Sequence, residues 1–272
     1  IEKMICVRQW KKASQVSSDD TRALFSLKGP PEKRGKRKGR FLRRDTPLSI
    51  KASMHWDGGL CENFCTSASL CMLVHVEEVD DEIRAVGAKA TIVELDQTDY
   101  AATPRLADAI ASRWGRLDGF VANAGQLGQM APMAHIEPDI WERTLSVNLT
   151  SIWFQAKTFD PLLRAAPAGR VVLVSSGAAV GARPFWGAYA VSKAGLESMA
   201  RAWAAESEQT NMKINLLDPG GTATAMRASA FPGEDPATLP SPADIAPAFV
   251  TLLSEGCEGH GERYTARDLT GL

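Results

Sequence analysis

The sequence predicts an α/β domain over residues 77–272, in which short buried strands alternate with helices. Runs of β-branched and aliphatic residues, such as residues 171–174, are typical of parallel strands that are buried on both faces. Segments with apolar residues at helical spacing separate these runs, and polar or glycine-containing turns follow them. With 272 residues, 44% of them hydrophobic, and a formal net charge of −1, the chain is large enough to bury one substantial core.

The first elements alternate between helix and strand. Residues 77–86 have helical spacing and end at Gly87, and residues 90–95 form a strand closed by Asp96. We expect a helix over residues 103–116 with Thr103 as its N-cap, since proline follows directly. A buried strand at residues 117–122 runs into Asn123-Ala124-Gly125, and a long helix is predicted over residues 138–164.

The second half repeats this alternation. A buried strand leads to Ser175 and Ser176, and a helix that contains Tyr189 follows a loop broken by glycine and proline. The strand at residues 212–217 ends before Asp218-Pro219-Gly220. Residues 225–240 show no period and predict a mobile loop over a pocket. Ser241 predicts the N-cap of a further helix, and residues 261–266 predict a short final strand.

Tyr189 and Lys193 are the strongest candidates for chemistry. Residues four apart lie on the same face of a helix, so the phenol and the ammonium group can lie side by side. A nearby cation favours the phenolate and lowers the phenol pKa from its usual ~10, which suits a general acid or base. Ser176 lies at the end of the preceding strand, where its hydroxyl can hold the oxygen that is protonated. A bare Tyr-x-x-x-Lys pattern also occurs in ordinary amphipathic helices, so the neighbouring motifs decide the interpretation.

Taken together, these motifs resemble the short-chain dehydrogenase/reductase family over about residues 77–272. The set has the family's order and approximate spacing: Asn123-Ala124-Gly125, Asn148, Ser176, Tyr189 with Lys193, and Pro219-Gly220 followed by Thr224. The resemblance implies a doubly wound parallel sheet, that is, a Rossmann-like fold. It also implies an NAD(P)-dependent oxidoreductase that interconverts a small-molecule alcohol and a carbonyl by hydride transfer.

The resemblance assigns roles to individual residues. Tyr189 is the expected general acid/base, Lys193 lowers its pKa and binds the nicotinamide ribose, and Ser176 orients the carbonyl. Asn148 completes the catalytic set, through a water that relays protons in its region. The expected contacts of the NAD or NADP cofactor are Asp96, Asn123, Ala124, Gly125, Tyr189, Lys193, Pro219, Gly220 and Thr224.

Simpler interpretations of several of these residues remain open. Asp96 is equally consistent with a turn aspartate, and the Asn-Ala-Gly and Pro-Gly sequences are consistent with plain turns. The resemblance implies a homo-oligomer, a dimer or tetramer, that packs through the helix at residues 138–164. The sequence does not distinguish NAD from NADP, and it does not identify the substrate.

Residues 1–76 differ from the rest of the chain and predict a separate N-terminal segment. They carry 15 Lys/Arg and 7 Asp/Glu, a net charge of +8, whereas residues 77–272 carry a net charge of −9. Residues 33–44 contain eight basic residues, which indicates either a solvated arm or a nucleic-acid patch; the solvated arm is the commoner case, so no nucleic-acid partner is expected. No metal site is predicted, because the spacing matches no standard zinc motif among His55, Cys61, Cys65, Cys71 and His75.

The N-terminal segment also lacks the glycine-rich turn that the resemblance requires after a first strand. That turn lets backbone N–H groups approach a pyrophosphate. It is expected near residues 44–55, where the sequence is RDTPLSIKASMH. One hypothesis is therefore that the segment is a frame-shifted or mis-joined reading of the gene. Two alternative functions follow: a non-catalytic relative that binds no cofactor, and a basic-armed nucleic-acid or interaction protein.

The cellular location is predicted from the lack of targeting and membrane-spanning patterns in the sequence. No run of ~18 apolar residues indicates a membrane span, and the first residues show no secretory signal. Five cysteines, a low and odd number, are typical of a reducing compartment. These observations predict a cytoplasmic protein without a membrane partner.

Overall fold

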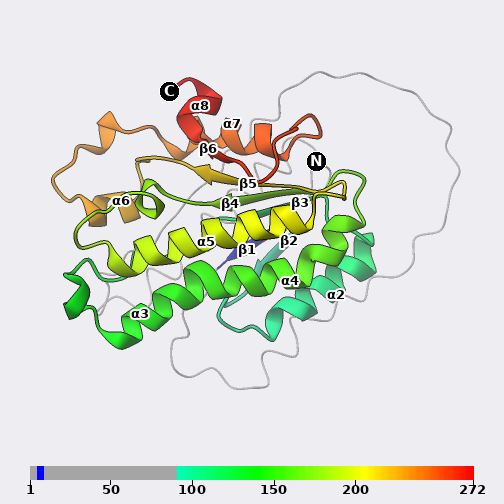
Figure 1. The fold of residues 1–272 in the computed structure, drawn as a ribbon, viewed down its shortest axis with the longest axis horizontal. Coiled ribbons are helices and arrows are strands. Elements are labelled where there is room, and N and C mark those ends of the chain that lie inside the picture. The colour runs from blue at the N-terminus through cyan, green and yellow to red at the C-terminus, as the bar shows by residue number, and fades with distance from the viewer. Residues whose placement is uncertain (1–4, 9–90) are drawn as a thin grey trace, which may run out of the picture.

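The computed structural model describes residues 5–8 and 91–272, which form parallel strands between two layers of helices (Figure 1). Four strands make the main sheet, in the order β3 (Gly119–Ala122), β4 (Arg170–Val174), β5 (Lys213–Asp218) and β6 (Arg263–Thr265). Each neighbouring pair is parallel. The predicted parallel α/β architecture is therefore confirmed.

A second, two-stranded sheet lies beside the first. It consists of β1 (Ile5–Arg8) and β2 (Thr91–Glu94), paired in parallel. Within the described ranges no strand joins this pair to the main sheet, so β3 is paired on one edge only. Val121 in the middle of β3 is 36% exposed, whereas all five residues of β4 are buried.

One helical layer is formed by α2 (Ala102–Trp114), α4 (Ser151–Arg164) and α5 (Gly187–Glu206), with α3 (Pro138–Leu145) leading into α4. The opposite face of the sheet is covered by α7 (Pro242–Leu253) and α8 (Ala266–Thr270) (Figure 1). Each layer encloses its own core. The larger core lies between the sheet and the first layer and includes Ile152, Leu163, Leu173 and Leu196.

The predicted helix over residues 138–164 is continuous, but its middle is not a regular α-helix. Between α3 and α4 the chain forms a π-helical turn, η3 (Ser146–Thr150), with Asn148 at its centre. Such single π-turns widen the helix by one residue and are frequent at functional sites.

Three local expectations are corrected. Residues 225–240 contain the helix α6 (Ala225–Ala230) and a 3₁₀ turn, η5 (Pro236–Thr238), because the side chains of Thr224 and Asp235 cap them. Ala101, not Thr103, is the N-cap of α2. The final strand is shorter than predicted, because the Thr265 side chain starts α8 with a capping box.

Several expectations fall on residues that the structure does not describe. They are the helix at residues 77–86, the basic run, the cysteines and histidines weighed as zinc ligands, and the position expected for the glycine-rich turn. Among the described residues, no helix is both long enough and apolar enough to cross a membrane.

Candidate active site

Ser176 is placed at the carboxyl end of β4, where the strand gives way to a turn. Its backbone is extended, and its hydroxyl accepts a hydrogen bond from the Ala178 N–H at 3.3 Å, which caps the 3₁₀ turn η4 (Gly177–Ala179). Parallel strands end at one common edge of the sheet, and ligands of such sheets bind at that edge. Ser176 therefore lies at the edge of the sheet where a substrate can bind.

Tyr189 faces Ser176 from the first turns of α5. Tyr189 is 7% exposed, and the Ser176 side chain lies close enough to its phenol to affect the pKa of that group. Burial raises the pKa of Tyr189 to about 12, the Ser176 side chain lowers it in part, and the negative charge of Asp218 raises it. The phenol is thus protonated at neutral pH and lies beside the predicted serine.

Lys193 lies one turn further along α5 and is 1% exposed. Its Nζ donates a hydrogen bond to the Val174 carbonyl at 2.7 Å and lies 5.9 Å from the centre of the Tyr189 ring. Burial lowers the pKa of Lys193 to about 8. The sequence predicts a lowered pKa for the phenol, and the structure gives the opposite direction. Burial outweighs the ammonium group because Nζ is directed at the backbone of β4.

Asn148 fastens the turn after β3 to the π-helical segment. Its Oδ1 accepts from the Gln126 N–H at 2.7 Å, and its Nδ2 donates to the Gln126 carbonyl at 2.8 Å and to the Ser192 hydroxyl at 3.0 Å. The side chain is fully buried. Ser192 precedes Lys193, so Asn148 connects the β3 turn with the helix that carries Tyr189. Asparagine is unfavourable within a helix unless its side chain has a partner, and here the side chain makes three hydrogen bonds.

The predicted cofactor contacts on β2 and β3 lie at the carboxyl ends of these strands. Asn123, Ala124 and Gly125 directly follow β3. The Asn123 Oδ1 is buried and has no hydrogen-bond partner in the described part of the chain. Asp96 follows β2, and its Oδ1 accepts from both the N–H and the hydroxyl of Thr98, which is the geometry of a turn aspartate.

Pro219 and Gly220 form the turn after β5. The Gly220 N–H donates to Asp218 Oδ1 at 2.9 Å, and Gly220 has a φ of +72°, which a residue with a side chain adopts only with strain. No atom lies within 4 Å of the position that a Cβ would occupy. Thr224 accepts from the Arg227 N–H and donates to the Thr222 carbonyl, both at 3.2 Å.

These residues fit a dinucleotide in two respects. An open glycine turn and a buried acceptor without a partner, Asn123 Oδ1, both lie at the carboxyl ends of parallel strands. A ligand that donates a hydrogen bond would satisfy that acceptor. The fit is incomplete at Thr224, whose hydroxyl already caps α6.

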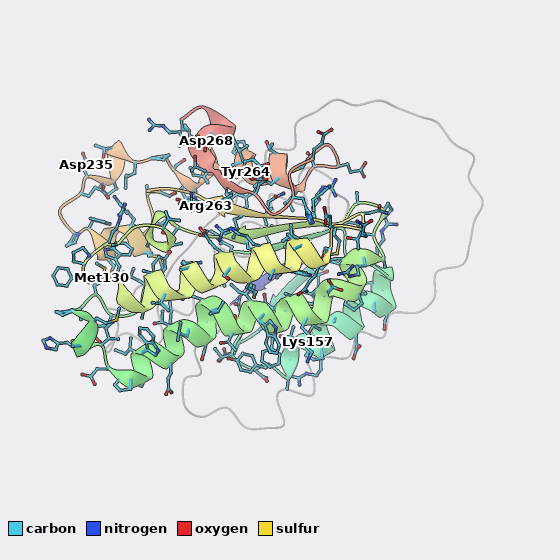
Figure 2. All side chains as sticks on the ribbon, in the orientation of Figure 1. Met130, Lys157, Asp235, Arg263, Tyr264 and Asp268 are labelled. Atoms are coloured by element: carbon cyan, nitrogen blue, oxygen red, sulfur yellow. The ribbon has the colours of Figure 1, made fainter. Side chains whose placement is uncertain are left out.

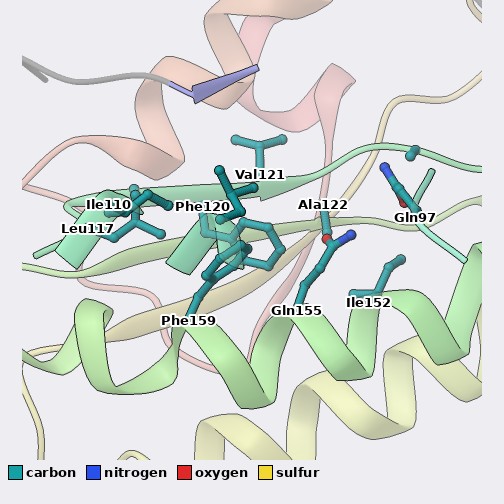
Figure 3. Close-up of a pocket in the computed structure, with 12 residues that line it drawn as sticks. Gln97, Ile110, Leu117, Phe120, Val121, Ala122, Ile152, Gln155 and Phe159 are labelled. Atoms are coloured by element: carbon teal, nitrogen blue, oxygen red, sulfur yellow. The ribbon is translucent and has the colours of Figure 1, made fainter. Parts of the chain in front are cut away.

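A small cavity of about 60 Å³ lies between β3, α2 and α4 and contains none of the predicted catalytic residues (Figure 3). Its wall is mostly apolar and includes Phe120 and Phe159. Two amides, Gln97 and Gln155, lie at the end near Ala122 (Figure 3), and the Gln155 Nε2 is buried without a partner. The cavity runs along β3, and Tyr189 does not line it.

Sequence reasoning missed other residues that the structure adds to the site. Trp186 contacts the Tyr189 ring edge-on, with 5.7 Å between ring centres. Glu197 is buried one turn after Lys193, and it bonds Ser175, the neighbour of Ser176, at 2.6 Å. Its spacing of four from Lys193 was a usable signal. Arg263, which also contacts Glu197, gave none, because it is 66 residues away in the chain.

Comparison with known proteins agrees with this geometry. A model of the short chain dehydrogenase family matches residues 64–235. The chain is 42% identical over 151 residues to the uncharacterised oxidoreductase YciK of Escherichia coli K12, covering 56% of this chain and 60% of that protein. It is 34% identical over 194 residues to the short-chain dehydrogenase/reductase FrzI of a Cladobotryum species, covering 65% of this chain and 74% of that protein. The match to YciK thus spans less than two thirds of that relative.

Solved structures show the same similarity. A short-chain dehydrogenase from Escherichia coli CFT073 in complex with NADPH superposes with a TM-score of 0.67 at 36% identity, covering 71% of this chain and 81% of that one. One from Shigella flexneri 2a in complex with NADP superposes with a TM-score of 0.67 at 35% identity, covering 71% and 82%.

Proposed function

Because the chain belongs to the short-chain dehydrogenase family, we propose that it is an NAD(P)-dependent oxidoreductase that interconverts a carbonyl and an alcohol. One observation carries the proposal: Ser176, Tyr189 and Lys193 converge at the carboxyl end of β4. The Ser176 side chain lies close enough to the phenol to lower its pKa, and the lysine Nζ lies 5.9 Å from the centre of the phenol ring. This is the set of groups that a proton transfer to a carbonyl oxygen requires.

The protein's own residues would handle the proton and the developing charge. The bound cofactor supplies or accepts the hydride. In reduction, the Ser176 hydroxyl would hold the carbonyl oxygen, and Tyr189 would donate its proton to that oxygen as negative charge develops. Lys193 would stabilise the resulting phenolate until solvent returns the proton. A phenol that is protonated at neutral pH is the form needed for this direction.

The dinucleotide would be held along the carboxyl edge of the sheet. Support comes from the Asn123-Ala124-Gly125 turn, with its unpartnered Oδ1, and from the open turn at Gly220. Lys193 would bind the nicotinamide ribose, and Asp96 remains a candidate for the adenine. The NADPH and NADP complexes of the two similar structures favour NADP(H) over NAD(H).

Aromatic side chains beside Tyr189 favour a substrate with an apolar, ring-containing body. Trp186 contacts Tyr189, and the ring centres of Phe231 and Trp186 are 5.8 Å apart. Val180 and Phe185 are exposed large apolar residues in the segment between Ser176 and α5. Such a wall gains more from an aryl ketone than from a short aliphatic one, because aromatic rings bury more area and pair with specific geometry.

Titration of the purified full chain with NADPH and NADH, followed by cofactor fluorescence, tests the proposal first. Reduction of aryl and aliphatic ketones is then measured for the wild type and for Tyr189→Phe. We expect NADPH binding, turnover that favours aryl ketones, and loss of turnover in Tyr189→Phe with retained NADPH binding. Turnover that persists in Tyr189→Phe would overturn the assignment of the acid/base.

A non-catalytic protein is the second candidate, and the separation of the two sheets favours it. In the described chain, β3 lacks a partner on the side where β1 and β2 lie. If neither NADPH nor NADH binds at millimolar concentration, this second function is the better one. Retention of the chain on nucleic acid, lost with rising salt, would instead support the basic-arm alternative.

The exposed face of α4 supports the expectation of a homo-oligomer. Trp153 is 44% exposed on this helix and adjoins a shallow hollow that is also lined by Leu149, Thr150 and Met199. Large exposed apolar groups that cluster on one face are typical of protein interfaces. We propose a second copy of the chain as the occupant.

A further inference from the structure

A cluster of charged groups continues the Tyr189–Lys193 face of α5 by one further turn. Its centre is Glu197, whose side chain is 3% exposed. The carboxylate accepts hydrogen bonds from the Ser175 hydroxyl at 2.6 Å, from Arg201 at 2.7 Å and from Arg263 Nε at 2.8 Å. A carboxylate with three donors is well compensated for its burial, and its pKa is lowered despite the opposing effect of burial.

Arg263 extends this cluster from α5 to the far side of the site. It lies on β6 (Figure 2), and its Nη2 donates to Asp218 Oδ2 at 2.8 Å. The other oxygen of Asp218 accepts the Gly220 N–H at 2.9 Å. One guanidinium group therefore connects Glu197 with the carboxylate that shapes the turn after β5.

The cluster contacts two segments that lie on opposite sides of the proposed reaction centre. Through Glu197 it reaches Ser175, which adjoins the oxygen-orienting Ser176. Through Asp218 it reaches Gly220, in the turn that would face the cofactor. Planar forked donors fix two carboxylates more rigidly than a point charge does.

We propose that Arg263 is a positioning residue for the reaction, which holds the Gly220 turn and the Ser175–Ser176 segment in register across the active site. The inference rests on the proposed function. The hydrogen bonds of Arg263 go to Asp218 and Glu197 and to none of the four predicted catalytic residues, so it acts through these two carboxylates.

Electrostatics adds a second consequence. Among the described residues, Asp218 on β5 is the charged group that shifts the pKa of the Tyr189 phenol, and the ammonium group of Lys193 on α5 lies 5.9 Å from the ring centre. The charge of Asp218 raises the pKa of Tyr189, and Arg263 forms an ion pair with that carboxylate. Without the guanidinium, the negative charge acts on the phenol with less compensation, and the phenol holds its proton to higher pH.

The test compares Arg263→Met, Arg263→Lys and the control Arg267→Met, an arginine of α8 that bonds the Leu272 carbonyl at the end of the chain. Hydrogen exchange of the Gly220 segment is measured in the free protein, so this readout needs no activity. We expect faster exchange in Arg263→Met than in the wild type. The exchange rate of Arg263→Lys should lie between these two, and that of the control should equal the wild-type rate. Unchanged exchange in Arg263→Met would overturn the proposal.

Activity then separates positioning from a general loss of stability. We expect kcat/KM to fall ~10- to 100-fold in Arg263→Met, with NADPH affinity weakened and partial rescue by Arg263→Lys. In alcohol oxidation, the acid limb of the pH profile moves to higher pH in Arg263→Met and to lower pH in Asp218→Asn. Shifts in the same direction, or no shift, would overturn the electrostatic part. If the wild type binds no NADPH, the proposed function fails, while the exchange result still decides the role of Arg263 at the turn.

If Arg263→Met does not fold, the double variant Glu197→Gln/Arg263→Gln removes one charge of each sign and keeps a polar side chain at both positions. The same exchange measurement at Gly220 then applies. Exchange equal to that of the wild type in the folded double variant would count against the proposal.

Discussion

At the scale of single residues, Lys193 is a group whose burial lowers the stability of the folded protein. An ammonium group that is 1% exposed loses its hydration and regains one hydrogen bond, to the Val174 carbonyl. Its pKa of about 8 lies below the ordinary value of 10.5, so the folded state disfavours the charged form. An apolar side chain at this position would fill the same space without the free-energy cost of burying an ammonium group.

We therefore predict that Lys193→Met abolishes turnover but raises the free energy of unfolding at pH 7. The sign follows from linkage: between pH 8 and 10 the unfolded state keeps the lysine proton and the native state has released it. Wild-type stability consequently rises over this window, with a slope of at most ~1.4 kcal/mol per pH unit from this group. Above pH 10 the unfolded tyrosines ionise while Tyr189, with its pKa of about 12, does not, so stability falls again.

Urea unfolding of both proteins at pH 7, 8, 9 and 10 measures this difference. The rise between pH 8 and 10 should be smaller in Lys193→Met than in the wild type. Identical pH dependence in the two proteins would show that Lys193 is hydrated in solution.

At the scale of elements, the π-helical turn η3 lets one side chain hold two segments that are far apart in the sequence. Asn148 bonds Gln126 twice and Ser192 once, across separations of 22 and 44 residues. The buried amide can therefore satisfy its neighbours only if the turn after β3 and α5 are both in place. The candidate active site and the packing of these helices are thus coupled through one residue.

For Asn148→Ala we expect a loss of ~3–4 kcal/mol in the free energy of unfolding, because a buried side chain loses three hydrogen bonds and leaves their partners unpaired. Chemical denaturation measures it, with Asn211→Ala, an exposed asparagine before β5, as the matched control. If Asn148→Ala loses less than about 1 kcal/mol more unfolding free energy than the control does, water replaces the amide.

A second prediction at this scale concerns α4. Trp153→Glu places a charge on the exposed apolar face, which should dissociate the proposed oligomer because burying an unpaired carboxylate is costly. Light scattering coupled to size-exclusion chromatography measures the mass. Val180→Glu, a change of an exposed apolar residue outside α4, serves as a control that should leave the mass unchanged. A wild-type protein that is already monomeric would contradict the prediction.

At the scale of the whole molecule, the sequence was informative where the determinants are local. Strand ends, the Asn123-Ala124-Gly125 and Pro219-Gly220 turns, and the spacing of Tyr189 and Lys193 all follow from residues a few positions apart, and the structure places these residues on elements close to those predicted. The Glu197–Arg263–Asp218 contacts join α5, β6 and β5, and no local pattern specifies them. The direction of the Tyr189 pKa also escaped prediction, because burial is a property of the assembled core.

The division into two sheets has a consequence that exchange of backbone amides can measure. β4 is paired on both sides and wholly buried, whereas β3 is paired on one side in the described chain and exposes Val121. Amides that are paired and buried open only with the global unfolding of the domain, while the free edge of a sheet opens locally. We predict that peptides over residues 119–122 exchange faster than peptides over residues 170–174. Equal protection would show that another strand covers the open edge of β3 in solution, and the separation of the sheets would then no longer favour the non-catalytic alternative. Faster exchange that slows on addition of NADPH would instead link closure of this edge to cofactor binding, because a ligand that binds only the ordered state stabilises it.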